Sequence, residues 1–216
     1  MSHDASVEQQ ILATIDKWVE QELRPIAREF DQADEYPSDL VEQMKELGLF
    51  GATISEEYGG LGLSASTYAR IVSRICEVWM APSGIFNSHL IMASCVERAG
   101  TQAQKEHFLP KFATGELRGG IGLTEPDAGS DLQGIRLVAK KDGDDYIIRG
   151  NKMWITNGMQ ADWMCCLVNT SEGKPHMNKS LVMIPMDTKG VERSRKLHKL
   201  GMWASDTAQI FLDDVR

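Results

Sequence analysis

Hydrophobic residues change their spacing near residue 118 of the chain. Before that point they recur three or four positions apart, which places them on one face of a helix. After it they alternate with polar residues in short runs, as is typical of half-buried strands. The pattern therefore predicts a helical half, residues 1–118, followed by a strand half, residues 119–216.

Helices are expected throughout the first half. The first spans Glu8–Phe30, with a kink at Pro25. The second begins at Ser38, a good N-cap residue, and stops at Gly48. Three more follow in chain order: 68–79, 82–100, and a last helix that begins at the capping box of Thr101 and Gln104 and is closed by Pro110 and Gly115.

Strands are expected throughout the second half. Runs at 137–141 and 146–150 flank the turn sequence DGDD and predict a hairpin. Further runs lie at 153–156, 163–169, 180–186 and 208–215, and Asn157-Gly158 is a strong turn signal. No helical pattern separates these runs. The predicted fold class is therefore α+β, an all-helical N-terminal domain followed by an antiparallel β-barrel or sandwich.

Composition and charge narrow the range of partners. The chain has 216 residues, 42% hydrophobic and 25% charged, which suits one or two globular domains. Its net charge is −8, and residues 1–118 carry all of it, with 18 acidic against 10 basic side chains. An acidic chain without a basic stripe is not expected to bind nucleic acid. One short basic cluster, 193–199, either meets an anionic ligand or forms a solvated strand edge.

The cysteines and the N-terminus indicate a reducing compartment, and a cytoplasmic protein is expected. None of the four cysteines forms a Cys-x-x-Cys pair, and no Cys or His spacing matches a metal site. The N-terminus has no signal or transit character. No apolar run approaches 18 residues, so no membrane span is predicted.

Glycine-rich GGLGLSA at 59–65 resembles a dinucleotide-binding fingerprint only superficially. That fingerprint requires a preceding strand and a surrounding βαβ unit, whereas helices flank this stretch on both sides. We therefore interpret it as a glycine loop between helices.

LTEPDAGSD, residues 123–131, is the most unusual stretch. Pro126 and Gly129 predict a tight loop whose N–H groups could face a ligand, although an ordinary capped turn has the same chemistry. Its three acids, Glu125, Asp127 and Asp131, raise the possibility of calcium, but their spacing is not that of an EF-hand.

A second motif, NKMWITNG at 151–158, places Trp154 and Thr156 two positions apart on a strand, so both face one side. An aromatic plate beside a hydroxyl suits a planar ligand with polar edges. A core tryptophan beside a surface threonine is the alternative.

In this order, YGGLGLS, LTEPDAGSD, GNKMWITNG and KLGMWASDTAQIFLDDVR resemble the acyl-CoA dehydrogenase family, from about Val7 to Arg216. The resemblance implies FAD as cofactor and an acyl-CoA substrate. It implies that Ile121, Leu123 and Thr124 hold the pyrimidine edge of the flavin, and that Ser130 contacts flavin and CoA. The further residues implied are Trp154, Ile155 and Thr156 at the flavin ring, and Asn178 near the CoA arm.

The implied reaction is oxidation to the 2,3-enoyl-CoA, with α-proton abstraction and hydride transfer to flavin N5, in fatty acid or amino acid catabolism. Electron-transfer flavoprotein or a similar acceptor and a homo-oligomer, dimer or tetramer, are implied as partners. The family's catalytic base is a Glu of a C-terminal helical domain, so no catalytic residue is assigned in this chain. The sequence is expected to be the first two domains of a longer protein and inactive alone. A non-catalytic flavin- or acyl-CoA-binding module and a flavin-dependent monooxygenase or nitroalkane-type oxidase are the alternatives.

Overall fold

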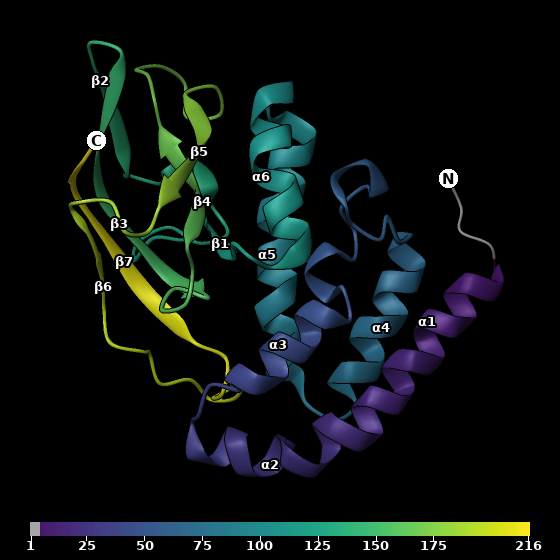
Figure 1. Cartoon of the computed structure of the whole chain (residues 1–216). Coiled ribbons are helices and arrows are strands. Elements are labelled where there is room, and N and C mark those ends of the chain that lie inside the picture. Colours follow the sequence, from purple (N-terminus) through teal and green to yellow (C-terminus); the bar gives the residue numbers. More distant parts are fainter. Residues whose placement is uncertain (1–4) are drawn as a thin grey trace. The chain divides into compact units, whose positions relative to one another are not determined.

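A computed structural model describes residues 5–216, and Figure 1 shows helices first in the chain and strands after them. Two compact units are distinguished. The helical unit contains the chain up to Glu116 together with His198–Ser205, and the β unit contains Leu117–Leu197 and Asp206–Arg216. The α+β fold class is confirmed. The domain boundary expected after residue 118 stays a prediction, because compactness alone does not establish a domain.

The helical unit is built from six α-helices and short turns among the described residues. The α-helices are α1 Ala5–Trp18, α2 Arg24–Ala33, α3 Ser38–Glu46, α4 Ala65–Cys76, α5 Met80–Ala99 and α6 Gln102–Thr114. Its short elements are η1 Val19–Leu23, η2 Leu49–Gly51 and η3 Glu56–Tyr58. Large apolar side chains from α3, α4, α5, α6 and η2 fill the core, among them Phe50, Phe86 and Phe112.

Several helix boundaries follow the sequence signals, and others do not. The Thr101 and Gln104 capping box is present, and Gly48 and Gly115 take left-handed conformations just after α3 and α6. Near the expected kink, a π-helical turn, η1, comes immediately before α2, and Pro25 is the second residue of α2. Ser38 is not the N-cap, since Pro37 holds that position. Pro110 lies inside α6, where burial of the following Phe112 favours continuing the helix.

The loop after α3 is a glycine loop between helices, as expected, and not a nucleotide fingerprint. A Cβ on Gly60 would lie 2.1 Å from the Ile54 carbonyl oxygen, so only glycine fits this close approach. Glu97 of α5 holds the start of the loop, because its carboxylate accepts from the backbone N–H of Ser55 at 3.1 Å.

The β unit is one seven-stranded mixed sheet in the order β1-β4-β2-β3-β7-β6, with β5 also paired to β4. The strands are β1 Gly119–Gly122, β2 Val138–Asp142, β3 Asp145–Thr156, β4 Trp163–Asn169, β5 Lys179–Pro185, β6 Val191–Arg193 and β7 Thr207–Val215. The β2–β3 hairpin is confirmed, and the two runs expected at 146–150 and 153–156 are one strand, β3.

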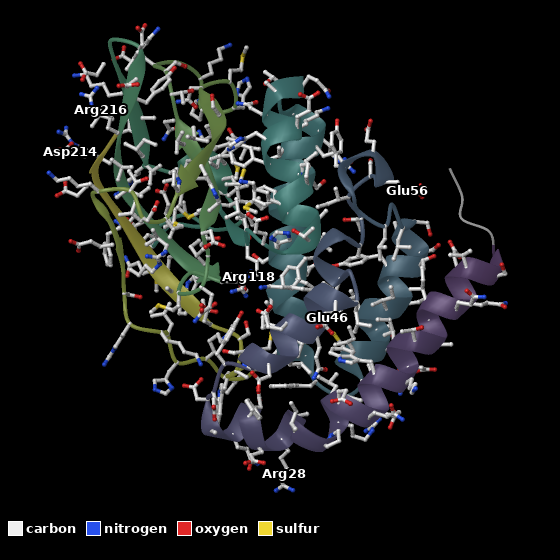
Figure 2. All side chains as sticks on the ribbon, in the orientation of Figure 1. Arg28, Glu46, Glu56, Arg118, Asp214 and Arg216 are labelled. Carbon is white, nitrogen blue, oxygen red and sulfur yellow. The ribbon has the colours of Figure 1, made fainter. Side chains whose placement is uncertain are left out.

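One prediction about the sheet was wrong: it is not wholly antiparallel, because β1 pairs with β4 in parallel. The short Gly-rich β1 and the three-residue β6 were not predicted at all. Apolar side chains from β2, β3, β4, β5 and β7 share one core. Asp214 and Arg216 project from the end of β7 (Figure 2), and Arg216 bonds Asp145 at 2.9 Å at the tip of the β2–β3 hairpin.

Within residues 5–216, no helix is long and apolar enough to cross a membrane.

Candidate functional site

The two unusual motifs of the sequence meet in the β unit. The backbone N–H of Met153, in β3, donates to the Thr124 carbonyl at 2.8 Å. One residue earlier in β3, the Lys152 ammonium donates to the Leu123 carbonyl at 2.9 Å. The segment that follows β1 therefore lies along the part of β3 that leads to Trp154.

Segment 123–131 is a tight loop, as its proline and glycine predict. Glu125 and Ala128 exchange backbone hydrogen bonds of 2.8 and 3.2 Å. Asp131 accepts from the Gln133 N–H at 3.1 Å and so caps the short helix η4, Leu132–Gly134. Asp127 meets the exposed Arg136 guanidinium at 3.3 Å.

Asp131 and Asp127 thus each have a protein partner. Across the described part of the chain, no three His, Cys, Asp or Glu side chains are grouped to hold a metal ion.

Glu125 is the acid that ties the loop to the sheet. Its carboxylate is buried and receives the Lys152 ammonium at 2.9 Å. It also accepts from the backbone N–H groups of Arg136, at 2.6 Å, and Leu137, at 3.0 Å. A buried carboxylate needs such partners, because an unpaired charge would lose its hydration without compensation. Glu125 therefore joins both ends of the 123–137 stretch to β3.

Trp154 occupies a bulge of β3. Its φ is +62°, a left-handed conformation that is uncommon for a large side chain. The pairing of β3 with β7 shifts register between Lys152 and Ile155, which marks the bulge. Trp154 is 55% exposed, whereas Ile155 is 3% exposed. Bulges re-aim side chains and are frequent beside functional sites.

The burial pattern agrees with the predicted strand face. Trp154 is exposed, Ile155 is buried in the sheet core, and Thr156 is partly buried, so residues 154 and 156 share the face opposite Ile155. Ile155 therefore supports the face from below and does not present its side chain to a ligand there.

The turn after Thr156 is fixed on two sides. Asn157 has φ +64°, and its side-chain amide donates to the Gly119 carbonyl at 2.9 Å, which joins the end of β3 to the start of β1. Arg193 of the basic cluster donates to the carbonyls of Gly158, at 2.9 Å, and Ala161, at 3.1 Å. This member of the cluster thus binds backbone.

The other three residues predicted for the site are Ile121, Ser130 and Asn178. Ile121 is partly buried in β1, in register with Cys165 of β4. Ser130 is exposed within the 123–131 loop. Asn178 belongs to the β4–β5 loop, where its side-chain oxygen accepts from Lys179 at 3.0 Å. None of the hydrogen bonds seen in residues 5–216 joins Asn178 to the 123–131 loop or to Trp154.

Cys166 is a buried thiol of β4 whose pKa is influenced by both members of the ion pair. Burial raises its pKa to about 12, the neighbouring Lys152 lowers it in part, and Glu125 raises it. A buried thiol with a raised pKa is an unreactive core residue.

Sequence reasoning missed Lys152, which has no exposed side-chain surface. Lysines are almost never fully buried unless paired, so the residue type gave no signal. Strand alternation did give a signal. Lys152 lies four positions after Ile148 on β3, so its side chain is expected on the same core-facing side of the strand.

The helical unit has its own cavity of about 560 Å³ between α4 and α5, lined in part by Tyr68, Cys76, Ser83 and Asn87. The Tyr68 hydroxyl donates to Asn87 at 2.8 Å, and burial raises the pKa of Tyr68. His89 packs edge-on against the rings of Phe50 and Phe112.

Comparison with known families gives two matches that together cover nearly the whole chain. Residues 6–116 match the family model of the N-terminal domain of acyl-CoA dehydrogenase, and residues 120–215 match that of its middle domain.

Individual proteins agree with these matches. The long-chain specific acyl-CoA dehydrogenase, mitochondrial, of Sus scrofa is 35% identical over 213 residues, covering 94% of this chain and 48% of its own length. An acyl-CoA dehydrogenase structure from Geobacillus kaustophilus is 35% identical with a TM-score of 0.89, over 99% of this chain and 57% of that one.

A glutaryl-CoA dehydrogenase from Mycobacterium smegmatis, solved in complex with FADH2, is 33% identical with a TM-score of 0.85, over 99% of this chain and 54% of that one. The chain spans about half the length of the curated relatives it matches.

Proposed function

The chain belongs to the acyl-CoA dehydrogenase family, and from this premise we propose that the protein oxidises an acyl-CoA thioester to the 2,3-enoyl-CoA with a bound flavin. The observation that carries the proposal is Trp154, a 55% exposed aromatic side chain held outward by a left-handed bulge. Thr156 lies two residues away on the same face. A planar ring with polar edges fits such a face, because it can pack on the indole and bond the hydroxyl.

Segment 123–124 supports the same proposal through its hydrogen-bonding groups. The Leu123 carbonyl accepts from Lys152, and the Thr124 carbonyl accepts from the backbone of Met153. With both carbonyls engaged, this segment offers chiefly N–H groups and the Thr124 hydroxyl, which are donors. The pyrimidine edge of a flavin carries carbonyl oxygens that accept such bonds. Ile121, through its place in β1, and Ile155, through its place in the core, hold the backbone on either side.

FAD is the cofactor that we propose, in keeping with the FADH2 named for the relative from M. smegmatis. When bound, it supplies the acceptor for the hydride of the oxidised carbon–carbon bond. The chain's own residues hold and orient it and cover one face against water. Ser130 and Asn178 are proposed to contact the CoA moiety.

The catalytic base is proposed to be a Glu outside this chain, as the family resemblance implies. Glu125 is the carboxylate of this chain most closely tied to the site, and its contacts argue against a role as the base. It is buried and already accepts from Lys152, Arg136 and Leu137, so it cannot turn toward a substrate proton. A base has to lie within hydrogen-bond reach of the proton that it removes.

Electron-transfer flavoprotein or a similar acceptor, a homo-oligomeric assembly and a cytoplasmic location complete the proposal. They follow from the family resemblance and from the sequence, and each is open to direct measurement.

The decisive experiment uses the longer protein that would include the proposed base, purified with its flavin, and mixes it anaerobically with a panel of acyl-CoA thioesters. Loss of the oxidised flavin absorption band and formation of enoyl-CoA are expected with at least one thioester. Bound flavin that no acyl-CoA reduces would favour the non-catalytic module. Reoxidation by oxygen with release of peroxide, at the rate of turnover, would favour an oxidase of the same fold. A protein that binds no flavin at all would contradict the proposal.

A further inference from the structure

Lys152 and Glu125 form an ion pair that is removed from solvent. Their side chains are 0% and 6% exposed, and the ammonium nitrogen lies 2.9 Å from Oε1. Lys152 also donates to the Leu123 carbonyl, and Glu125 accepts two backbone N–H groups. The pair is therefore embedded in a network in which both charges have several partners.

Stability alone is a poor explanation for such a pair. Removing two charges from water is costly, and replacing a buried pair by apolar side chains of similar volume is often neutral or stabilising. What an ion pair does provide is a fixed geometry, since its hydrogen bonds are directional.

The network fixes one particular geometry. Lys152 and Met153, consecutive in β3, hold three consecutive residues of the other motif: Leu123, Thr124 and Glu125. The next residue of β3 is Trp154, at the bulge. The spacing between segment 123–124 and Trp154 is thus set by contacts that end one residue before the tryptophan.

We infer that Lys152 is a positioning residue of the flavin-binding face, an inference that rests on the proposed function. Being fully buried, it reaches neither flavin nor substrate. It holds the donors of segment 123–124 at a fixed distance from Trp154 and Thr156, so that one rigid ligand meets both at once. Its removal should loosen this spacing even where the sheet remains folded.

Three variants separate positioning from stability. Lys152→Met removes the ammonium with little change in side-chain length. Lys152→Met combined with Glu125→Gln removes both charges and avoids an unpaired buried carboxylate. Lys140→Met is the matched control for loss of a lysine, because Lys140 is exposed on β2.

Hydrogen exchange is the first measurement, and it needs no cofactor. The Met153 amide, which donates to Thr124, should exchange about tenfold or more faster in the double variant, because the lost bond from the charged Lys152 ammonium contributes about that factor or more. Amides of the β4–β5 ladder should keep their wild-type protection. A Met153 amide as protected as in the wild type would overturn the inference.

Titration with FAD is the second measurement. The single variant should lose both thermal stability and FAD affinity. The double variant should regain most of the melting temperature, yet its dissociation constant for FAD should stay about tenfold or more above the wild-type value. Recovery of affinity together with stability would show that Lys152 acts only through folding. Failure of the wild type itself to bind FAD would contradict the proposed function instead. The hydrogen-exchange experiment would still test whether Lys152 holds segment 123–124 in place.

Discussion

The Asn157 side-chain amide donates to the carbonyl oxygen of Gly119, 38 residues earlier in the chain, at 2.9 Å. This bond closes the β3 end of the candidate site onto β1, the strand that leads into segment 123–131. Asn157 is buried and takes a left-handed φ of +64°, which asparagine tolerates better than most residues. One residue thus supplies both the turn conformation and the tie between the strands.

Asn157→Ala should destabilise the β unit by about 2 kcal/mol or more, because a buried carbonyl loses its donor and alanine is strained at positive φ. Asn157→Gly separates the two effects, since glycine accepts the backbone conformation but not the hydrogen bond. Denaturant unfolding of the three proteins measures this. Equal stability of the wild type and the alanine variant would rule out the structural role of the bond.

Trp154→Ala should lower flavin retention and leave the unfolding transition nearly unchanged. The side chain is mostly exposed, so little core packing is lost. A stacked ring loses about 0.5–1.5 kcal/mol beyond the area it buries. Flavin content after gel filtration and a melting curve give the two readings.

Trp154→Phe is the control, since it keeps an aromatic face at the same position and should retain more flavin than the alanine variant. Wild-type flavin occupancy in Trp154→Ala would remove this residue from the proposed site.

Thr156→Val keeps the size of the side chain and removes its hydroxyl. If this hydroxyl bonds the flavin, the dissociation constant should rise about 2- to 12-fold, the value of one net hydrogen bond of 0.5–1.5 kcal/mol. Thr188→Val, in the turn between β5 and β6, makes the same chemical change away from the site and should have no effect. Indistinguishable titration curves for Thr156→Val and the wild type would exclude the hydroxyl as a ligand.

Local signals predicted those parts of the fold that depend on neighbours in the chain. The capping box at Thr101 and the glycine stop at Gly48 act within one helical turn, and both appeared where expected. The parallel pairing of β1 with β4 joins Gly119 to Trp163, and no short-range pattern encodes such a contact.

The site shows the same division. Trp154 and Thr156 were placed on one face by strand alternation, which is a local property. Burial of Lys152 was not predicted, because its partner Glu125 lies 27 residues earlier. The acids of the 123–131 loop were weighed as calcium ligands for the same reason: their partners become visible only in the folded chain.

Cys166 should make the stability of the β unit depend on alkaline pH. Its pKa is raised by burial to about 12 from an ordinary value of 9.0. The folded state therefore keeps a proton that the unfolded state releases between these values. Its contribution is fully present below about pH 9 and is lost as the pH rises toward 12, with a slope of at most about 1.4 kcal/mol per pH unit.

The free energy of unfolding, measured from pH 8 to 11 in the wild type and in Cys166→Ala, tests this. The variant should be less stable at pH 8 because of the cavity, yet its stability should fall less steeply above pH 9. Parallel curves for the two proteins would show that the thiol does not titrate as described.

Residues 1–216 on their own should not turn over acyl-CoA. The chain spans about half the length of its curated relatives, and the resemblance implies a base outside it. The structure adds that Glu125 is buried, paired with Lys152 and bonded to two backbone N–H groups. Loss of a proton-abstracting group costs about 10²–10⁴-fold in rate.

The assay expresses residues 1–216 alone and measures flavin content, oligomeric state and turnover with several acyl-CoA thioesters, alongside Glu125→Gln. Clear turnover by residues 1–216 would place a base within these residues and contradict this expectation. Turnover that survives the substitution would place the base elsewhere within these residues.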